Sequence, residues 1–294
     1  DFITTLGNKY PMDEYRLIRD YQNGEIIFDR RYGSTNTFEK NNYPVGYNLG
    51  QSGNTPSQNL VDAYEMIDGT PFDWNNPEHK SNPYANRDPR LAMSILTNNV
   101  EFKDRTIEAW TGGRDGKGVI HATRTGYYIY KFIDPNLDLL QNRTSVHHWV
   151  IMRYAEILLS YAEAMNEAYG PTGNVGYRLN AVRALNQVRN RVGVEMPAVP
   201  TAISKEELRE KIRNERRVEL AFEDHRFWDV RRWMIAPETL GAPLRGVEIT
   251  KISDEEFEYK PIEVEKRTFE PKMYLYPIPQ ADLNTTGWVQ NPLW

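Results

Sequence analysis

The spacing of apolar residues predicts three consecutive helices in the middle of the chain. The first covers residues 147–170, where apolar side chains occupy nearly every helical face and the run stops at a Gly-Pro pair. In the second, residues 177–193, apolar residues recur every three or four positions, which is typical of a helix with one buried face. The third opens with a capping-box pattern at 204–207 and continues to Trp233. Helix pairs joined by short Gly/Pro turns indicate tetratricopeptide-like α-α packing.

The two ends of the chain show a different pattern. Residues 1–143 are interrupted by Pro, Gly or Asn every few positions, so long loops should dominate, with one short strand at 126–134. Residues 236–294 mix prolines with aromatic rings, which favours an extended segment laid over a helical body. We therefore expect a mainly α, single domain over residues 1–294: a loop-rich part (1–143), a helical-repeat frame (144–235) and an extended C-terminal part (236–294).

The third predicted helix carries much charge and ring surface together. Its stretch NERRVELAFEDHRFWDVRRW, residues 214–233, holds five arginines, five carboxylates and four large aromatic residues. At about 100° per residue, Glu215, Glu219 and Arg226 fall on the apolar side of this helix. Buried carboxylates are costly unless paired, and Arg153, amid apolar residues of the first helix, is the expected outside partner. We interpret these four residues as a buried structural ion-pair network.

Metal-site chemistry and nucleic-acid binding account for these charges less well. A two-metal site on facing helices needs a Glu-x-x-His repeat, whereas the third residue after Glu219 is Phe222, so we predict no metal site and no catalytic residue. The net charge of -5, with acids interleaved among the bases, argues against a nucleic-acid partner. The absence of cysteine excludes disulfides and thiolate metal sites, and no cofactor is expected. No apolar run reaches membrane-spanning length.

Several long motifs, in one order, resemble the SusD/RagB family of outer-membrane glycan-binding lipoproteins. These motifs are TPSQNLVDAYEMIDGTPFDW, RDPRLAMSILTNN, IMRYAEILLSYAEAMNEA, LNAVRALNQVRNRVG, the charged stretch and YLYPIPQADLNTTGWVQNPLW. The resemblance covers the chain from about Thr55 onward. The family's signal peptide, lipidated cysteine and first helical repeats have no counterpart in this sequence, so we expect the lipid anchor to lie upstream of it.

The resemblance implies a binding protein rather than an enzyme. Family members are surface-exposed at the outer membrane and deliver oligosaccharides to a SusC-like TonB-dependent transporter in a nutrient-uptake system. Their helical repeats form a rigid frame, and loops outside the repeats carry the sugar site. No sugar-binding residue can be carried over to this chain, because the sugar-contacting loops lie outside the matching motifs.

A sugar site needs exposed aromatic rings beside planar polar side chains, because sugars present flat C–H faces ringed by hydroxyl groups. The best match is the loop 69–88, which three prolines should stiffen. The residues predicted to bind glycan are Phe72, Asp73, Trp74, Asn75, Asn76, Tyr84 and Arg87, with Trp110 in a second loop. Packing of Trp74 against the frame remains an equal alternative. The remaining tryptophans are interpreted as core residues: Trp149, Trp228, Trp233, Trp288 and Trp294.

Two further functional classes stay open. A glycoside hydrolase would need two carboxylates across a cleft, about 5 to 9.5 Å apart, for which Asp73 and Glu78 are the available candidates. A protein-interaction module would use the helical repeats to bind the transporter or a peptide, with no sugar site of its own.

Overall fold

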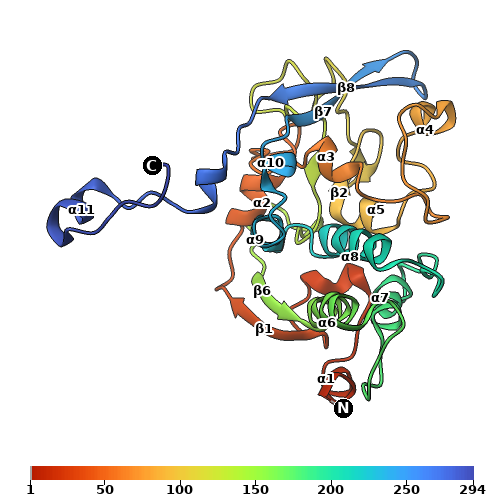
Figure 1. Cartoon of the computed structure of the whole chain (residues 1–294). Helices are drawn as coiled ribbons and strands as arrows, with labels where there is room; N and C mark the ends of the chain where they lie inside the picture. The colour runs from red at the N-terminus through yellow and green to blue at the C-terminus, as the bar shows by residue number, and fades with distance from the viewer. Residues whose placement is uncertain (1) are drawn as a thin grey trace.

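Three helices from the middle of the chain pack together and form the frame. In the computed structural model, which describes residues 2–294, these helices are α6 (Tyr154–Tyr169), α7 (Ala181–Arg189) and α8 (Lys205–Glu219). The short helix α1 (Phe2–Lys9) lies against α6 (Figure 1). The predicted mainly α fold with tetratricopeptide-like helix pairs is confirmed.

Local sequence explains where these helices begin and which faces they bury. Asn180 caps α7, since its side chain accepts a hydrogen bond from the Arg183 backbone at 2.9 Å. Ser204 and Glu207 form the predicted capping box of α8. Leu208 and Ile212 of α8 are fully buried in the same apolar cluster as the inner faces of α6 and α7. Each such side chain contributes roughly 1.5–3 kcal/mol when it leaves water.

The strands differ most from the sequence-based expectation. Residues predicted as the start of the first helix form β6 (His148–Arg153), which pairs antiparallel with β1 (Ile26–Arg31). The predicted strand 126–134 is reduced to β5 (Tyr128–Ile129), paired with β2 (Ile95–Leu96). An apolar, β-branched run such as the one in β6 fits a strand or a buried helix, and the distant partner strand decides the outcome.

The remaining N-terminal part consists of loops with short elements, as its Pro, Gly and Asn content predicts. These elements are η1 (Tyr15–Arg19), α2 (Thr37–Asn42), α3 (Gln58–Val61), α4 (Pro77–Ser81), α5 (Arg90–Ser94), β3 (Glu101–Phe102) and β4 (Arg105–Thr106). A second apolar core gathers beneath them, and Val218 of α8 belongs to it. Helix α8 therefore joins the core of the frame to the core of the loop-rich part.

The C-terminal part is only partly extended. After α9 (His225–Arg232) and α10 (Ala236–Thr239), the strands β7 (Leu244–Lys251) and β8 (Phe257–Glu265) form an antiparallel hairpin that packs on the loop-rich part. The short helix η2 (Pro271–Tyr274) still contacts α9, because Arg231 donates to the Met273 carbonyl at 2.8 Å. The segment after it, with α11 (Gln280–Thr286), projects away from the body (Figure 1). We call residues 271–294 the C-terminal arm.

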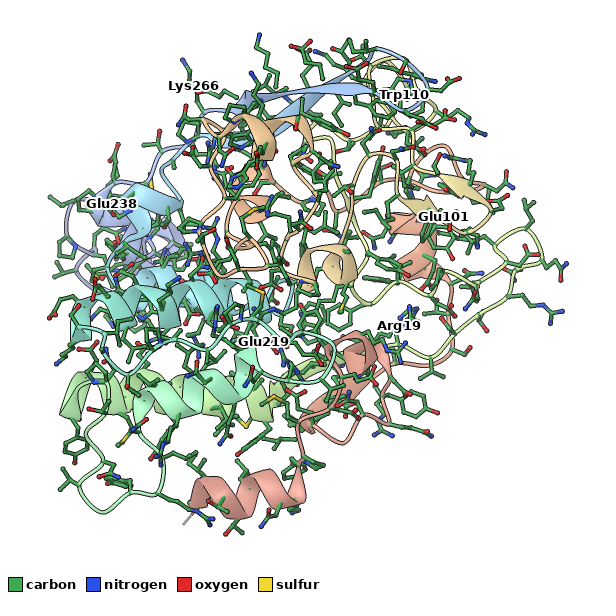
Figure 2. The ribbon with its side chains drawn as sticks, turned by 90° about the vertical axis from the view of Figure 1, so that its right-hand side faces the viewer. Arg19, Glu101, Trp110, Glu219, Glu238 and Lys266 are labelled. Carbon is green, nitrogen blue, oxygen red and sulfur yellow. The ribbon has the colours of Figure 1, made fainter. Side chains whose placement is uncertain are left out.

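A buried network of ion pairs joins the frame to the loops. Glu219, at the end of α8 and in the middle of the molecule (Figure 2), accepts hydrogen bonds from Arg90 at 2.8 Å, from Arg153 at 2.7 Å and from Arg191. Glu215, one turn earlier, pairs with Arg90 at 2.5 Å and with Arg189 at 2.8 Å. All of these side chains are buried.

Further carboxylates complete this network from separate segments. Arg153 also binds Glu25 at 2.8 Å and Glu223 at 2.7 Å, and Lys131 binds Glu223 at 2.6 Å. Burial by itself would raise the pKa of Glu219, but Arg191, Arg153 and Arg90 hold that pKa well below its usual range. Glu219 is therefore a charged structural group at neutral pH.

Arg226 does not belong to this network, which corrects the helical-wheel prediction. The wheel assumed one continuous helix, whereas α8 ends at Glu219 and the chain turns before α9 begins at His225. Phe222 and Asp224 adopt left-handed backbone conformations in this turn, with φ of 64° and 63°. Arg226 thus lies on a different helix, and it forms no hydrogen bond or ion pair with the residues that the structure describes.

We expect Glu219→Gln to lower the free energy of unfolding by roughly 3–5 kcal/mol, because it leaves three buried guanidinium groups short of one negative charge. Urea denaturation at pH 7, followed by circular dichroism, measures this change. The matched control is Glu238→Gln, at an exposed carboxylate, which should change stability by less than about 0.5 kcal/mol. Equal stability of Glu219→Gln and the parent protein would contradict a structural role for the network.

Candidate functional site

The loop 69–88 carries a cluster of rings that short-range hydrogen bonds hold in place. The Phe72 ring meets the edge of Trp74 at 5.1 Å between centroids and stacks on His79 at 5.4 Å. Asn76 caps α4 by accepting a hydrogen bond from the Glu78 backbone at 3.0 Å. The Asp73 carboxylate accepts one from the Asn75 backbone at 2.8 Å. The loop therefore presents its rings and polar groups in a defined arrangement.

Arg87 is a buried clamp beneath this loop. Its guanidinium donates hydrogen bonds to the carbonyl oxygens of Val61 at 2.6 Å, Tyr64 at 2.7 Å and Pro83 at 2.6 Å, and it stacks on Phe72 at 4.1 Å. Burial lowers the pKa of Arg87 to about 10. With its donors used within the protein, Arg87 is a positioning residue, which corrects its prediction as a sugar-contacting residue.

Tyr84 and Trp110 do not join the ring cluster of Phe72 and Trp74. The half-buried Tyr84 ring packs edge-on against Tyr127 and Tyr259 of the core, and its hydroxyl group donates to the Tyr127 hydroxyl at 3.3 Å. The Trp110 ring is half-buried against Phe257 of the hairpin, 5.3 Å between centroids. Of the predicted ligand-binding residues, the structure brings together Phe72, Asp73, Trp74, Asn75 and Asn76.

Trp74 packs against the core, which is one of the two roles that the sequence leaves open. Its ring is half-buried against the core, and its Nε1 donates a hydrogen bond to Asp62 at 3.0 Å. Asp62 also accepts from Gln58 at 2.7 Å and from Arg245 at 2.9 Å. Trp74 is therefore fixed at one edge, as a binding platform requires.

Three tryptophans predicted as core residues lie at the surface. Trp228 of α9 is 63% exposed, and Trp288 and Trp294 of the C-terminal arm are 62% and 44% exposed. The buried positions of α9 are instead Asp229 and Val230. The large ring of Trp favours burial, but Trp228 lies on the face of α9 that points to solvent.

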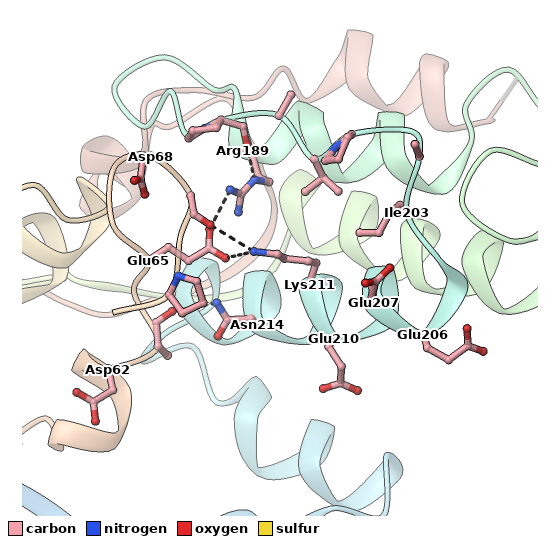
Figure 3. Close-up of a pocket in the computed structure, with 18 residues that line it drawn as sticks. Asp62, Glu65, Asp68, Arg189, Ile203, Glu206, Glu207, Glu210, Lys211 and Asn214 are labelled. Carbon is pink, nitrogen blue, oxygen red and sulfur yellow. Dashed lines mark hydrogen bonds and ion pairs between the residues drawn. The ribbon is translucent and has the colours of Figure 1, made fainter. Parts of the chain in front are cut away.

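A groove of about 930 Å³ runs between α8 and the segments that face it (Figure 3). Lys211 and Arg189 both bind Glu65 there, at 2.6 Å and 2.9 Å, so the basic groups are already neutralised. Acidic residues of α8 such as Glu206 and Glu210 lie at its edge (Figure 3), and the described residues that line the groove include no aromatic ring. The groove therefore lacks a stacking surface for a sugar.

A second pocket, of about 620 Å³, combines rings with basic groups. It lies between α3, α9 and the start of β7, and Asp62 lines both this pocket and the groove. Its ring and guanidinium groups are those of Phe222, Phe227, Arg217, Arg226, Arg245 and Arg267. No local pattern in the sequence indicates this pocket, because its residues come from four separate segments.

No metal centre is found within residues 2–294: the described His, Asp and Glu side chains form no group of three or more placed to hold an ion. The hydrolase candidates Asp73 and Glu78 are exposed on the same loop. None of the described helices is both long and apolar enough to traverse a lipid bilayer.

These features define a class of protein in which stacked helix pairs support long, ring-bearing loops. A model of the SusD family matches residues 24–294, and the chain belongs to that family. A SusD-like protein of Bacteroides fragilis has a TM-score of 0.78 at 29% identity, over 99% of this chain and 61% of that chain. A SusD-like carbohydrate-binding protein of the same species has a TM-score of 0.73 at 30% identity, over 89% of this chain and 53% of that chain.

A curated relative, a SusD-like protein of Formosa agariphila, is 34% identical over 120 residues, which is 39% of this chain and 22% of that protein. A surface glycan-binding protein of Bacteroides fluxus shares the fold at 21% identity, with a TM-score of 0.58 over 100% of this chain and 57% of that chain. The chain thus spans less than two thirds of the length of these relatives.

We expect Arg87→Gln to lower the free energy of unfolding by roughly 2–4 kcal/mol, because buried carbonyl oxygens would lose their donor. Urea denaturation measures the loss, and limited proteolysis of the loop 69–88 should accelerate with it. The control Lys80→Gln, at an exposed residue of the same loop, should alter neither. Normal stability and proteolysis together with weakened glycan binding would instead place Arg87 in the ligand site.

Proposed function

We propose that this chain is a non-catalytic glycan-binding component of a nutrient-uptake system at the cell surface. The observation that carries this proposal is membership of the SusD family together with the ordered ring cluster of the loop 69–88. A solved relative at 30% identity is described as a carbohydrate-binding protein, which supports the same role here. The glycan is an oligosaccharide or a polysaccharide.

The ring cluster supplies the groups that sugar recognition needs. Half-buried Phe72 and Trp74 offer apolar surface, and the neighbouring Asp73 and Asn75 are exposed and polar. Because Arg87 and the cap of α4 hold the loop from below, little conformational entropy is lost when a sugar binds. The proposed contact residues are Phe72, Asp73, Trp74, Asn75 and Asn76.

The proposal includes delivery of the glycan to a SusC-like TonB-dependent transporter. In this proposal, the protein is peripheral to the outer membrane and is held there by a lipid anchor upstream of this chain, as the family resemblance implies. A contact surface for another protein is supported by the C-terminal arm, where Tyr276 is 66% exposed, Val289 89% and Leu293 75%.

A protein-interaction module without a sugar site is the second candidate function. The same exposed apolar residues of the C-terminal arm favour it, because an apolar surface of this kind suits a protein partner better than a polar sugar. Retained transporter binding without affinity for any glycan would distinguish this function from the first.

We expect Trp74→Ala to weaken glycan binding about tenfold, or about 1.4 kcal/mol, because it removes the ring that a sugar face would cover. Affinity electrophoresis through gels containing a panel of polysaccharides identifies a ligand, and calorimetry then compares the proteins. The control Trp288→Ala removes an exposed ring on the C-terminal arm and should bind like the parent. Equal binding by Trp74→Ala would refute the loop as the sugar site, and release of products from a labelled oligosaccharide would revive the hydrolase.

A further inference from the structure

The arginines around the buried network and those of the second pocket differ in how their charge is balanced. Five buried guanidinium groups in or next to the frame each face at least one carboxylate: Arg90, Arg153, Arg189, Arg191 and Arg216. In the second pocket, Arg217 donates to the backbone carbonyl of Asn59, and Arg226 has no hydrogen-bond or ion-pair partner among the described residues. The buried guanidinium groups near the frame are thus paired with carboxylates, whereas Arg217 and Arg226 of the adjoining pocket are not.

The carboxylates near this pocket balance its guanidinium groups only in part: Asp62 acts on Arg217 and Asp229 on Arg226, each without forming an ion pair with it. Asp62 already accepts hydrogen bonds from Arg245, Trp74 and Gln58. Asp224 and Glu238 are exposed at the pocket and form no ion pair within the described part of the chain. Arg267 also lines the pocket, and its Nε donates to the Ala242 carbonyl at 3.1 Å.

Burial and mutual repulsion act on the two central guanidinium groups. Burial lowers the pKa of Arg217 to about 10; the nearby Arg226 adds to this effect, and the charge of Asp62 opposes it. Burial also lowers the pKa of Arg226; the charge of Asp229 opposes this shift, and Arg213 adds to it. A half-buried guanidinium without a carboxylate partner lowers stability, and a bound anion would offset part of that cost.

The local backbone brings these groups together. The turn between α8 and α9 holds Phe222 and Asp224 in left-handed conformations, so the first turn of α9 carries Arg226 toward the pocket beside Arg217 of α8. Strained backbone of this kind is found most often at functional sites. Phe222 and Phe227 add ring surface next to the guanidinium groups.

We propose that this pocket binds the anionic group of an acidic glycan, a carboxylate or a sulfate. This inference rests on the proposed function and specifies its substrate class. A guanidinium presents paired donors that match both oxyanions, and Arg217, Arg226 and Arg267 together supply several such donors. The pocket adjoins the ring loop through Asp62, which lines the pocket and accepts the Trp74 hydrogen bond, so one oligosaccharide can reach both.

The main test compares charged and neutral forms of the same oligosaccharide. Tetragalacturonate and its methyl ester form one pair, and a sulfated galactan oligosaccharide and its desulfated form make the second. The parent protein should bind a charged form about 30-fold more tightly than its neutral partner, with affinity falling as salt rises. The pair that shows this difference identifies the oxyanion as carboxylate or sulfate. Equal binding of charged and neutral forms in both pairs would overturn the proposal.

Variants separate recognition from folding. Arg226→Gln should weaken binding of the charged form about 30-fold and leave the neutral form unchanged. Its unfolding midpoint in urea should equal or exceed that of the parent, because an unpaired buried charge is removed. The matched control Arg30→Gln, at an exposed arginine of β1, has the same net charge and should bind like the parent. A midpoint lowered as in Glu219→Gln would make Arg226 a frame residue and overturn the proposal.

A measurement without sugar distinguishes failure of the pocket from failure of the proposed function. Sodium sulfate is titrated at constant ionic strength while the Nε–H resonances of arginine are followed by NMR. Resonances that shift in the parent but are missing or unmoved in Arg217→Gln and Arg226→Gln would show an anion pocket even if the glycan panel gave no ligand. Absence of any such shift would overturn the proposal, whichever glycan binds at the loop.

Discussion

The carboxylate of Glu219 is the point on which the rest of this structure depends. It accepts hydrogen bonds from Arg90, which is 129 residues away in sequence, from Arg153, which is 66 away, and from Arg191, which is 28 away. Buried ion pairs often add little net stability compared with apolar packing, but removing one partner is costly. All these bonds form together only when the loop-rich part, the β6–α6 junction and the segment after α7 reach the end of α8 at once. The network therefore selects one arrangement of distant segments.

This arrangement fixes the base from which the loops project. Arg90 begins α5, directly after the loop 69–88, and Arg87 joins that loop to α3 through carbonyl oxygens. Arg87 thus supports the ring of Phe72, and Arg90, three residues later, forms ion pairs with Glu215 and Glu219 of α8. Such support matters for sugar binding, because a sugar offers weak individual contacts and cannot offset the cost of ordering a mobile loop.

Sequence alone predicted those features that depend on local periodicity. The cap of α8 and the inward direction of Glu215 and Glu219 follow from a 3.6-residue repeat within one helix. Arg226 was misplaced because the repeat was continued through Leu220–Asp224, where no Gly or Pro marks the turn. The strand β6 was missed for a related reason: its pairing partner β1 lies more than a hundred residues earlier, beyond any local pattern.

Residue type also proved insufficient for the candidate site. Arg87 and Tyr84 have the chemistry of sugar-binding residues, but burial assigns one to backbone carbonyls and the other to a cluster of tyrosines. The sequence of one loop does not determine which of its side chains are exposed to solvent, because segments from elsewhere in the chain pack over them. The hairpin of β7 and β8, which covers Tyr84 through Tyr259, is one such segment.

Helix α8 contributes to both the frame and the proposed anion pocket. Arg216 and Arg217 are neighbours, so their side chains point about 100° apart. Arg216 is buried and binds Asp229 at 2.9 Å and Ser160 at 3.0 Å, whereas Arg217 lines the second pocket with a backbone carbonyl as its partner. A guanidinium that is paired with a carboxylate inside the protein has a structural role. A guanidinium without a carboxylate partner beside a pocket can gain free energy by binding an anionic ligand. The charges of this stretch therefore serve two purposes: those on one face of α8 hold the frame together, and Arg217 on another face lines the proposed anion pocket.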